Sequence, residues 1–128
     1  MVKATINDEN YKTDIRAGAH QLVSDEPKSL GGQDLGFSPD DLLAASLASC
    51  TAITLKMYVS RKEWSVDNIA VEVDFKYDRE NQVSSFFRNI KVNGSLNSIQ
   101  LKRLESVANN CPISKVLASK IINKTTLL

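Results

Sequence analysis

The alternation of apolar and polar residues is clearest in the second half of the chain, between residues 69 and 78. Each apolar side chain there is followed by a small or polar one, which is the two-residue period of a strand with one buried face. A turn near residues 79–82 returns the chain through a second strand. The apolar positions of that strand are Phe86, Ile90, Val92 and Leu96. Arg88 falls on the same face and is predicted to point inward, where it needs a partner such as a thiolate or Asp40.

The start of the chain shows the same two-residue period in shorter pieces, over residues 2–6, 11–16 and 20–24. These segments are predicted to form a meander of short strands. The following stretch, residues 24–41, contains two prolines and three glycines in 18 residues, which is the composition of a loop. Its length is typical of a functional loop rather than of a plain connection.

A long helix is predicted from Pro39 to Lys62. Ser38 is a good N-cap, proline fits the first helical position, and the acidic residues that follow suit the positive end of the helix dipole. Between Leu42 and Leu55 the side chains are apolar or small on every face. A helix without a polar face is buried on most sides, so this segment is expected to form the centre of the domain.

Two shorter helices are predicted near the end of the chain. The first covers residues 98–109 and is amphipathic. The second opens at Pro112, a residue suited to the first helical position, and continues to about Lys120. The tail at residues 124–128 is expected to add a last strand. The whole chain, residues 1–128, is therefore predicted to be a single α+β domain, with antiparallel strands around a long central buried helix.

The composition narrows the classes of partner. Apolar residues make up 42% of the chain and charged residues 24%, and the formal net charge is +1, which is ordinary for a soluble protein. Because no basic run stands out, nucleic acid is not an expected partner. The N-terminus lacks an apolar core of signal-peptide length, and we expect no apolar run of the ~18 residues that a membrane span needs. We therefore expect a cytoplasmic protein without a membrane partner.

The two cysteines are the candidate reactive groups. Cys50 and Cys111 lie far apart and form no C-x-x-C motif, and with a single histidine we expect no metal and no other cofactor. Cys50 lies about 16 Å along the helix from Pro39, beyond the reach of the helix dipole. It is either inert packing or a thiolate that needs a cation from elsewhere. Cys111 either ends the preceding helix or caps the next one, where free backbone N–H groups favour a thiolate.

Two motifs resemble a known family. The stretch "SPDDLLAASLASCTAITL", residues 38–55, resembles the "NPE-x-L-x-x-A-x-x-x-C" helix start of the OsmC/Ohr family, the osmotically inducible and organic-hydroperoxide-resistance proteins. "NNCPIS", residues 109–114, resembles the second cysteine site of that family, and "LGGQDLGFSP" resembles the loop before its helix. The order of elements also matches over essentially the whole chain. The resemblance implies an OsmC-like fold and an intertwined homodimer with two sites at its interface.

The same resemblance implies a cysteine-based peroxidase of the oxidative stress response that reduces organic hydroperoxides. Cys50 would attack the peroxide, and Cys111 would resolve the sulfenic acid as a disulfide, which a dithiol reductant then opens. Asp40 stands where the family has the carboxylate of its "NPE" motif, and Arg16 is the early arginine that would lie beside the thiolate. The rival cations are Arg88 and His20.

Two other functions stay open. The chain could be a non-catalytic protein that binds an apolar small ligand at the dimer interface, with cysteines that only line the pocket. It could also be a general redox-stress protein that exchanges disulfides with other proteins, although it has no C-x-x-C motif. Oxidation of the cysteines by an organic hydroperoxide separates the peroxidase from these two alternatives.

Overall fold

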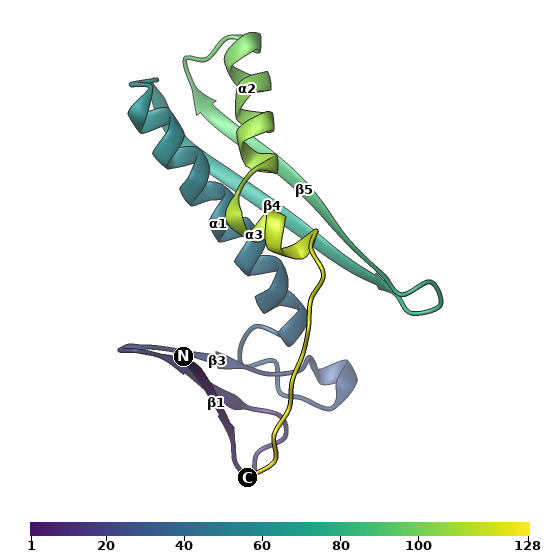
Figure 1. Ribbon diagram of the computed structural model, residues 1–128. Helices are drawn as coiled ribbons and strands as arrows, with labels where there is room; N and C mark the ends of the chain where they lie inside the picture. The colour runs from purple at the N-terminus through teal and green to yellow at the C-terminus, as the bar shows by residue number, and fades with distance from the viewer. The chain divides into compact units, whose positions relative to one another are not determined.

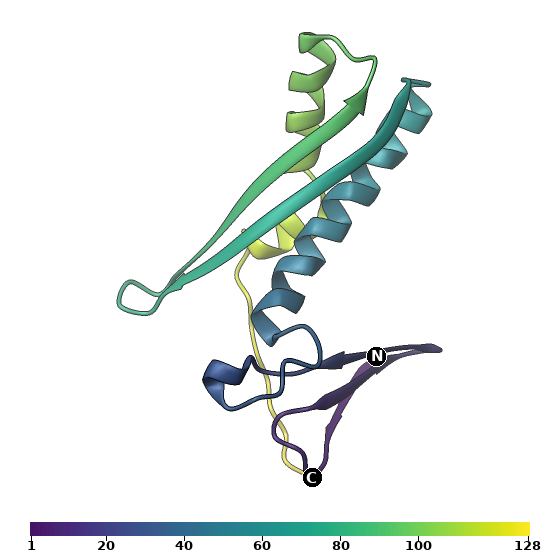
Figure 2. The ribbon, with the colours of Figure 1, turned by 180° about the vertical axis from the view of Figure 1, so that it is seen from behind.

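The computed structural model describes residues 1–128 and divides into two compact units, residues 1–44 and residues 45–128. Figures 1 and 2 show the elements from opposite sides. The elements of the first unit are β1 (Val2–Ile6), β2 (Thr13–Ala17), β3 (His20–Ser24) and the short helix η1 (Lys28–Leu30). Those of the second unit are β4 (Val66–Asp78), β5 (Val83–Gly94), α2 (Ser98–Asn109) and α3 (Pro112–Leu117). The long helix α1 (Pro39–Arg61) begins in the first unit and continues in the second, and the predicted α+β class is confirmed.

The first unit is built on an antiparallel meander in the order β1–β2–β3. Val2 pairs with Ala17 across the first hairpin, and His20 pairs with the same residue across the second. The three predicted strands are confirmed, except that β2 begins at Thr13 rather than at Tyr11. The meander buries no apolar side chain. The buried residues of this unit are Ser24 and Asp25.

Asp25 holds the loop that follows the meander. Its carboxylate accepts four backbone N–H groups at 2.8 to 3.2 Å. The donors are Tyr11, Glu26, Gln33 and Leu35. Burial raises the pKa of the Asp25 carboxyl, but the four hydrogen bonds outweigh burial and leave this pKa below its usual range. Close packing requires two of the loop glycines, because a Cβ at Gly32 or Gly36 would clash with a neighbouring backbone carbonyl.

Ser38 caps α1, as the sequence predicts. Its hydroxyl accepts the backbone N–H of Asp41 at 3.1 Å, and the Asp41 carboxylate accepts the N–H of Ser38 at 3.1 Å. This reciprocal pair satisfies two N–H groups that would otherwise lack partners at the start of the helix. The helix then continues to Arg61, one residue short of the predicted end.

The core of the second unit lies between two helices and a hairpin. β4 and β5 pair antiparallel, with Phe75 opposite Phe86, and Figures 1 and 2 show α1 and α2 on one face of this hairpin. The buried cluster consists of Leu55, Val59, Leu104 and Ala108. Burial of a large aliphatic side chain contributes about 1.5–3 kcal/mol, so this cluster stabilises the second unit by apolar packing.

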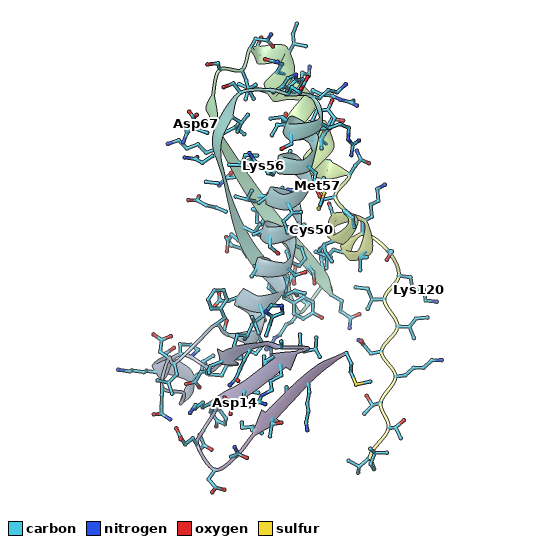
Figure 3. All side chains as sticks on the ribbon, turned by 90° about the vertical axis from the view of Figure 1, so that its left-hand side faces the viewer. Asp14, Cys50, Lys56, Met57, Asp67 and Lys120 are labelled. Atoms are coloured by element: carbon cyan, nitrogen blue, oxygen red, sulfur yellow. The ribbon has the colours of Figure 1, made fainter.

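The outer face of α1 differs from the prediction. The buried residues of the helix are Leu47, Thr51, Leu55 and Val59. By contrast, Ile53 is 54% exposed and Met57 is 62% exposed in the single chain. Figure 3 marks Met57 on α1, next to the exposed Lys56. A two-stranded hairpin and one neighbouring helix cover only one side of α1, so the expectation that it is buried on most sides is wrong for the single chain.

The composition of α1 corrects a second expectation. Over 18 residues its mean hydropathy is 1.5, so this helix is long and apolar enough to cross a membrane by length and composition alone. The expectation that no segment reaches this limit is therefore wrong. The core helix of a soluble protein passes the same test, so the composition does not assign a membrane to the chain.

The last residues of the chain correct two further predictions. α3 ends at Leu117 rather than near Lys120, and residues 120–128 form no strand. A strand needs a neighbour with which it exchanges backbone hydrogen bonds, and no segment of the chain takes this place. The last backbone hydrogen bond joins Ser119 to Val116.

Candidate active site

Cys111 caps the short helix α3, which decides between the two alternatives that its place before Pro112 left open. Its Sγ accepts the backbone N–H of Ser114 at 3.4 Å, and its own backbone is extended, with φ −62° and ψ 146°. Pro112 follows at the start of the helix, where a missing N–H has no consequence. The Cys111 side chain is fully buried. The start of α3 therefore places a sulfur atom beside free backbone N–H groups inside the protein.

Arg88 reaches the same sulfur from β5. The strand alternation turns this side chain to the inner face, as the sequence predicts, and its Nη1 lies 3.8 Å from the Sγ of Cys111. The other acceptors of the guanidinium are Thr51 Oγ1 at 2.8 Å, the Ala108 carbonyl at 3.0 Å and Asn109 Oδ1 at 2.9 Å. The one ion pair of the structure joins Lys76 to Asp74, so Arg88 has no carboxylate partner.

Thr51 lies between Arg88 and Cys111. Its fully buried hydroxyl accepts from the arginine, and its Oγ1 is 2.8 Å from the Leu47 carbonyl and 3.6 Å from the Cys111 Sγ. The single hydroxyl hydrogen can point to the carbonyl or to the sulfur, and a negatively charged sulfur is the stronger acceptor. Thr51 is absent from the residues predicted for the site. A hydroxyl directly after Cys50 in an apolar helix is the signal that points to it.

Cys50 approaches Cys111 from the middle of α1. Figure 3 marks its position on the helix, and its side chain is half-buried. The Cys50 thiol lies near enough to Cys111 to lower the pKa of that thiol. Both cysteines are free thiols. The two cysteines that the sequence singles out, far apart along the chain, are therefore neighbours in the fold.

The surroundings of Cys111 lower the pKa of its thiol below the ordinary value for cysteine. Burial is the largest single influence and acts the other way, because it disfavours the charged thiolate. Hydrogen bonds from the Ser114 N–H, the Thr51 hydroxyl and the Cys50 thiol lower the pKa. The positive charge of Arg88 lowers it further, and together these groups outweigh burial. The site therefore favours the thiolate of Cys111.

A cavity of about 480 Å³ lies beside this cluster. Its lining residues include Leu47, Phe86, Arg88, Ile90, Asn109 and Leu117. The lining is mixed, because Glu105 and two serines also contribute to the walls beside the arginine and the asparagine. Small-molecule sites usually have roughly 300–1,000 Å³, so the cavity can take a small molecule that has both apolar and polar groups next to the guanidinium.

The other predicted site residues belong to the first unit. Arg16 is exposed on β2, His20 is exposed at the start of β3, and Asp40 is exposed in the first turn of α1. At 1.5 Å per residue along the helix, Asp40 lies about 15 Å from Cys50 and cannot touch its sulfur. The structure brings Cys50, Cys111 and Arg88 together, and the roles of Arg16, His20 and Asp40 stay predictions.

Comparison with protein families identifies the class of protein. Residues 31–125 match the family model of the OsmC-like proteins. Since this match covers well over half of the chain, the protein belongs to the OsmC-like family, and the resemblance carried by its two cysteine motifs is confirmed. A comparison with curated proteins gave no match.

Solved structures of the same family share the fold. A Psychrobacter arcticus protein named for osmotic stress and detoxification is 25% identical, with a TM-score of 0.78 over 90% of this chain and 85% of that one. An OsmC-like protein of Mycoplasma pneumoniae is 18% identical, with a TM-score of 0.77 over 92% and 86%. The organic hydroperoxide resistance protein OhrB of Bacillus subtilis is 21% identical, with a TM-score of 0.61 over 91% and 87%. The last two likenesses establish the OsmC-like fold and no more.

Proposed function

We propose that the protein is a thiol-dependent peroxidase that reduces organic hydroperoxides, with Cys50 as the attacking thiol and Cys111 as the resolving thiol. The observation that supports this most is the pairing of two free thiols, one from α1 and one from the cap of α3, which are neighbours in the fold, so that Cys50 influences the pKa of Cys111. Membership of the OsmC-like family and a fold shared with proteins named for organic hydroperoxide resistance point in the same direction.

The first step of the proposed reaction oxidises Cys50. Its thiolate attacks one peroxide oxygen, the O–O bond breaks, and the alkoxide leaves and takes a proton to become an alcohol. The sulfur keeps one oxygen as a sulfenic acid. Cys50 suits this step because its side chain is only half-buried, whereas Cys111 has no exposed surface for a peroxide to reach.

The second step joins the two sulfur atoms. Cys111 attacks the sulfenic sulfur of Cys50, an S–S bond forms, and the hydroxyl group leaves as water after taking a proton. A dithiol reductant then opens the disulfide by exchange and restores both thiols. A reducing, cytoplasmic compartment fits this cycle, because the disulfide is transient and both cysteines rest as free thiols.

The surroundings favour an organic peroxide over hydrogen peroxide. The helix around Cys50 is apolar, and the nearby cavity has apolar walls from Leu47, Phe86 and Ile90. An alkyl or aryl group gains about 25 cal/mol for each Å² of apolar surface that it buries there. Hydrogen peroxide has no such surface, so it gains nothing from these walls.

The proposal includes a homodimer. A second copy on the uncovered face of α1 would bury Ile53 and Met57, which are more than half exposed in the single chain. Light scattering at micromolar concentration should then give twice the 14.1 kDa mass of one chain. A mass of one chain under these conditions contradicts the dimer.

Arg16 is proposed as the cation beside the Cys50 thiolate, and Asp40 as the carboxylate that holds this arginine. Arg16→Ala should slow the alkylation of Cys50 at about pH 6, because a nearby cation favours the thiolate. The rate is measured in a Cys111→Ser background, where Cys50 is the only thiol. An unchanged rate in Arg16→Ala and a slower one in Arg88→Ala would transfer this role to Arg88.

Mass spectrometry after one equivalent of an organic hydroperoxide tests the roles of the two cysteines. In Cys111→Ser, Cys50 should gain one oxygen and, without a partner thiol, proceed to the sulfinic acid as more peroxide is added. Cys50→Ser should stay unmodified and lose turnover. If Cys111 gains the oxygen instead, the two roles are reversed. If neither cysteine reacts, the peroxidase proposal is wrong.

The cavity beside Arg88 favours a second candidate function, the binding of an apolar small ligand without catalysis. In that case the cysteines only contribute to the walls of the site. Unreactive cysteines together with saturable binding of an apolar fluorescent probe would support this function over the peroxidase.

A further inference from the structure

A fully buried thiol is a poor nucleophile unless something removes its proton, because the thiolate is the reactive form. We infer that Arg88, with the Thr51 hydroxyl and the Ser114 N–H, holds Cys111 as a thiolate, and that this thiolate closes the disulfide without an external base. The inference rests on the proposed function. It gives a strand residue a part in the resolving step, which is separate from the attack on the peroxide.

The charge balance around Arg88 is the first support. A guanidinium stays positive at any physiological pH, and removing it from water is costly unless a negative charge balances it. Arg88 is half-buried and donates only to neutral oxygens and to the Cys111 sulfur. No carboxylate forms an ion pair with it. The sulfur is the only one of its acceptors that can become an anion.

The arrangement of donors around the sulfur is the second support. Three elements each place one polar group beside the Sγ of Cys111: the Ser114 N–H of α3 at 3.4 Å, the Thr51 hydroxyl of α1 at 3.6 Å and the Arg88 guanidinium of β5 at 3.8 Å. A neutral thiol is a weak acceptor, whereas a thiolate is a strong one. The two N–H donors stabilise the charged form of the fully buried sulfur more than the neutral form, and the Thr51 hydroxyl joins them when its hydrogen turns from the Leu47 carbonyl to the sulfur.

Few other titratable groups face this sulfur. α1 contributes the thiol of Cys50, which also lowers the pKa of Cys111. α2 contributes Glu105, which lines the cavity beside Arg88 but forms no ion pair with it. Lys115 is exposed on α3. Arg88 is therefore the charged group in contact with the Cys111 sulfur.

Formation of the disulfide by the Cys111 thiolate needs no further reactant. The Cys111 sulfur donates an electron pair to the sulfenic sulfur of Cys50, the new S–S bond forms, and the S–O bond of the sulfenic acid breaks. Hydroxide leaves and takes a proton from water or buffer to become water. Cys111 is oxidised and the sulfenic acid is reduced to the disulfide level. No proton has to leave Cys111 during the step, so no base is required.

A single-turnover experiment measures the two steps separately. Reduced protein is mixed with one equivalent of an organic hydroperoxide, quenched with acid at successive times and analysed by mass spectrometry. The sulfenic acid of Cys50 and the disulfide differ by one water, so the closure rate can be followed on its own. This rate is recorded across pH values on both sides of neutrality, for the wild type, Arg88→Met and Arg88→Lys. Arg79→Met, at an exposed arginine in the β4–β5 turn, is the matched control.

In Arg88→Met the pH at which closure becomes fast should rise, and closure at neutral pH should slow by about tenfold or more. A nearby opposite charge shifts a pKa by about 1–3 units, and each unit changes the thiolate fraction about tenfold. Arg88→Lys keeps the positive charge but loses the planar guanidinium group. Its closure rate and pH profile should therefore lie between those of the wild type and of Arg88→Met. Arg79→Met should keep both the wild-type rate and the wild-type pH profile.

An unchanged pH profile in Arg88→Met overturns the inference even when closure is uniformly slower, because a merely structural role does not move the profile. If Arg88→Met does not fold, the pH profile of Arg88→Lys is used instead, and an unchanged profile in that variant overturns the inference. If Cys50 of the wild type is not oxidised at all, the proposed function fails. The thiolate absorbance of Cys111 in a Cys50→Ser background then tests Arg88 alone: a titration moved to higher pH by Arg88→Met or Arg88→Lys supports the inference, and an unmoved one overturns it.

Discussion

Asp25 and Cys111 are two buried acidic groups in different units of the chain. In both, polar groups around the acid stabilise its charged form. Asp25 accepts four backbone N–H groups in the loop of the first unit. Cys111 accepts one backbone N–H from α3, and its other polar neighbours are side chains from β5 and α1. For both groups burial raises the pKa and the surroundings lower it by more: hydrogen bonds for Asp25, and hydrogen bonds together with the charge of Arg88 for Cys111.

The consequences differ because the ordinary pKa values of the two groups differ. A carboxyl group with a pKa of about 4 is already charged at neutral pH, so a lower pKa changes stability and not reactivity. A thiol with a pKa of about 8.5 is mostly neutral there, so a lower pKa brings its ionisation toward physiological pH. The same kind of hydrogen bonding therefore makes Asp25 an anchor for a loop and Cys111 a candidate nucleophile.

The two units also differ in what stabilises them. The first unit buries two polar residues and no apolar side chain, so its loop depends on the charge of Asp25. The second unit buries an apolar cluster that includes Leu55 and Leu104, and Cys111 lies in the same unit. We therefore expect the second unit to respond most to changes in packing and the loop of the first unit to respond most to pH.

The largest effect is expected from the apolar cluster. Leu55→Ala should lower the free energy of unfolding by about 2–5 kcal/mol, because Leu55 is fully buried and alanine leaves a cavity. Urea denaturation followed by the fluorescence of Trp64, which packs against the cluster, measures this change. Leu30→Ala, at an exposed leucine of the first unit, should change it by no more than about 0.5 kcal/mol. Equal losses in the two variants would contradict the distinction between the units.

A smaller effect is expected at the cysteine site. Thr51→Val keeps the shape of the side chain but removes the nearest acceptor of Arg88 Nη1, which should cost about 1–3 kcal/mol of unfolding free energy. It also removes one donor to Cys111, so the pKa of that thiol should rise. Urea denaturation gives the first quantity, and thiolate absorbance against pH gives the second. Thr54→Val on the same helix is the control, and a Cys111 pKa that rises equally in both variants would count against Thr51.

The smallest and most local effect is expected at Asp25. Because folding lowers the pKa of this carboxyl, its charge stabilises the fold above the unfolded pKa of about 3.9, and this contribution is lost as the pH falls through the folded pKa. Asp25→Asn replaces an accepting oxygen by a donating amide. It should therefore speed hydrogen exchange of the Gln33 and Leu35 amides at neutral pH.

The difference between Asp25→Asn and the wild type should shrink in acid, where the wild-type carboxyl is also neutral. Asp34→Asn, at an exposed position of the same loop, should leave the exchange of these amides unchanged. Exchange at neutral pH that is equal in Asp25→Asn and the wild type would show that the loop does not depend on this charge.

Local sequence patterns predicted most of the elements. The predicted helix over residues 98–109 and the predicted strand over residues 20–24 have the bounds that the structure shows. Short periods and helix caps involve residues within a few positions of one another, so they are visible in the sequence. Two predictions that failed concern features that depend on a partner far away in the sequence. The tail forms no strand because no other strand lies beside it, and the outer face of α1 is exposed because no other element covers it.

The sequence by itself determined that Arg88 points inward, because residues alternate along a strand, and that a helix begins at Pro112. It left two roles for Cys111, the end of one helix or the cap of the next, and the structure shows the cap. Only the tertiary structure decided that these two groups meet, with Thr51 between them. The sulfur lies 23 positions from Arg88 and 60 from Thr51, so the contacts depend on how the hairpin packs against two helices. No local pattern encodes that packing, which is why Arg88 had several possible partners in the sequence and has one sulfur partner in the fold.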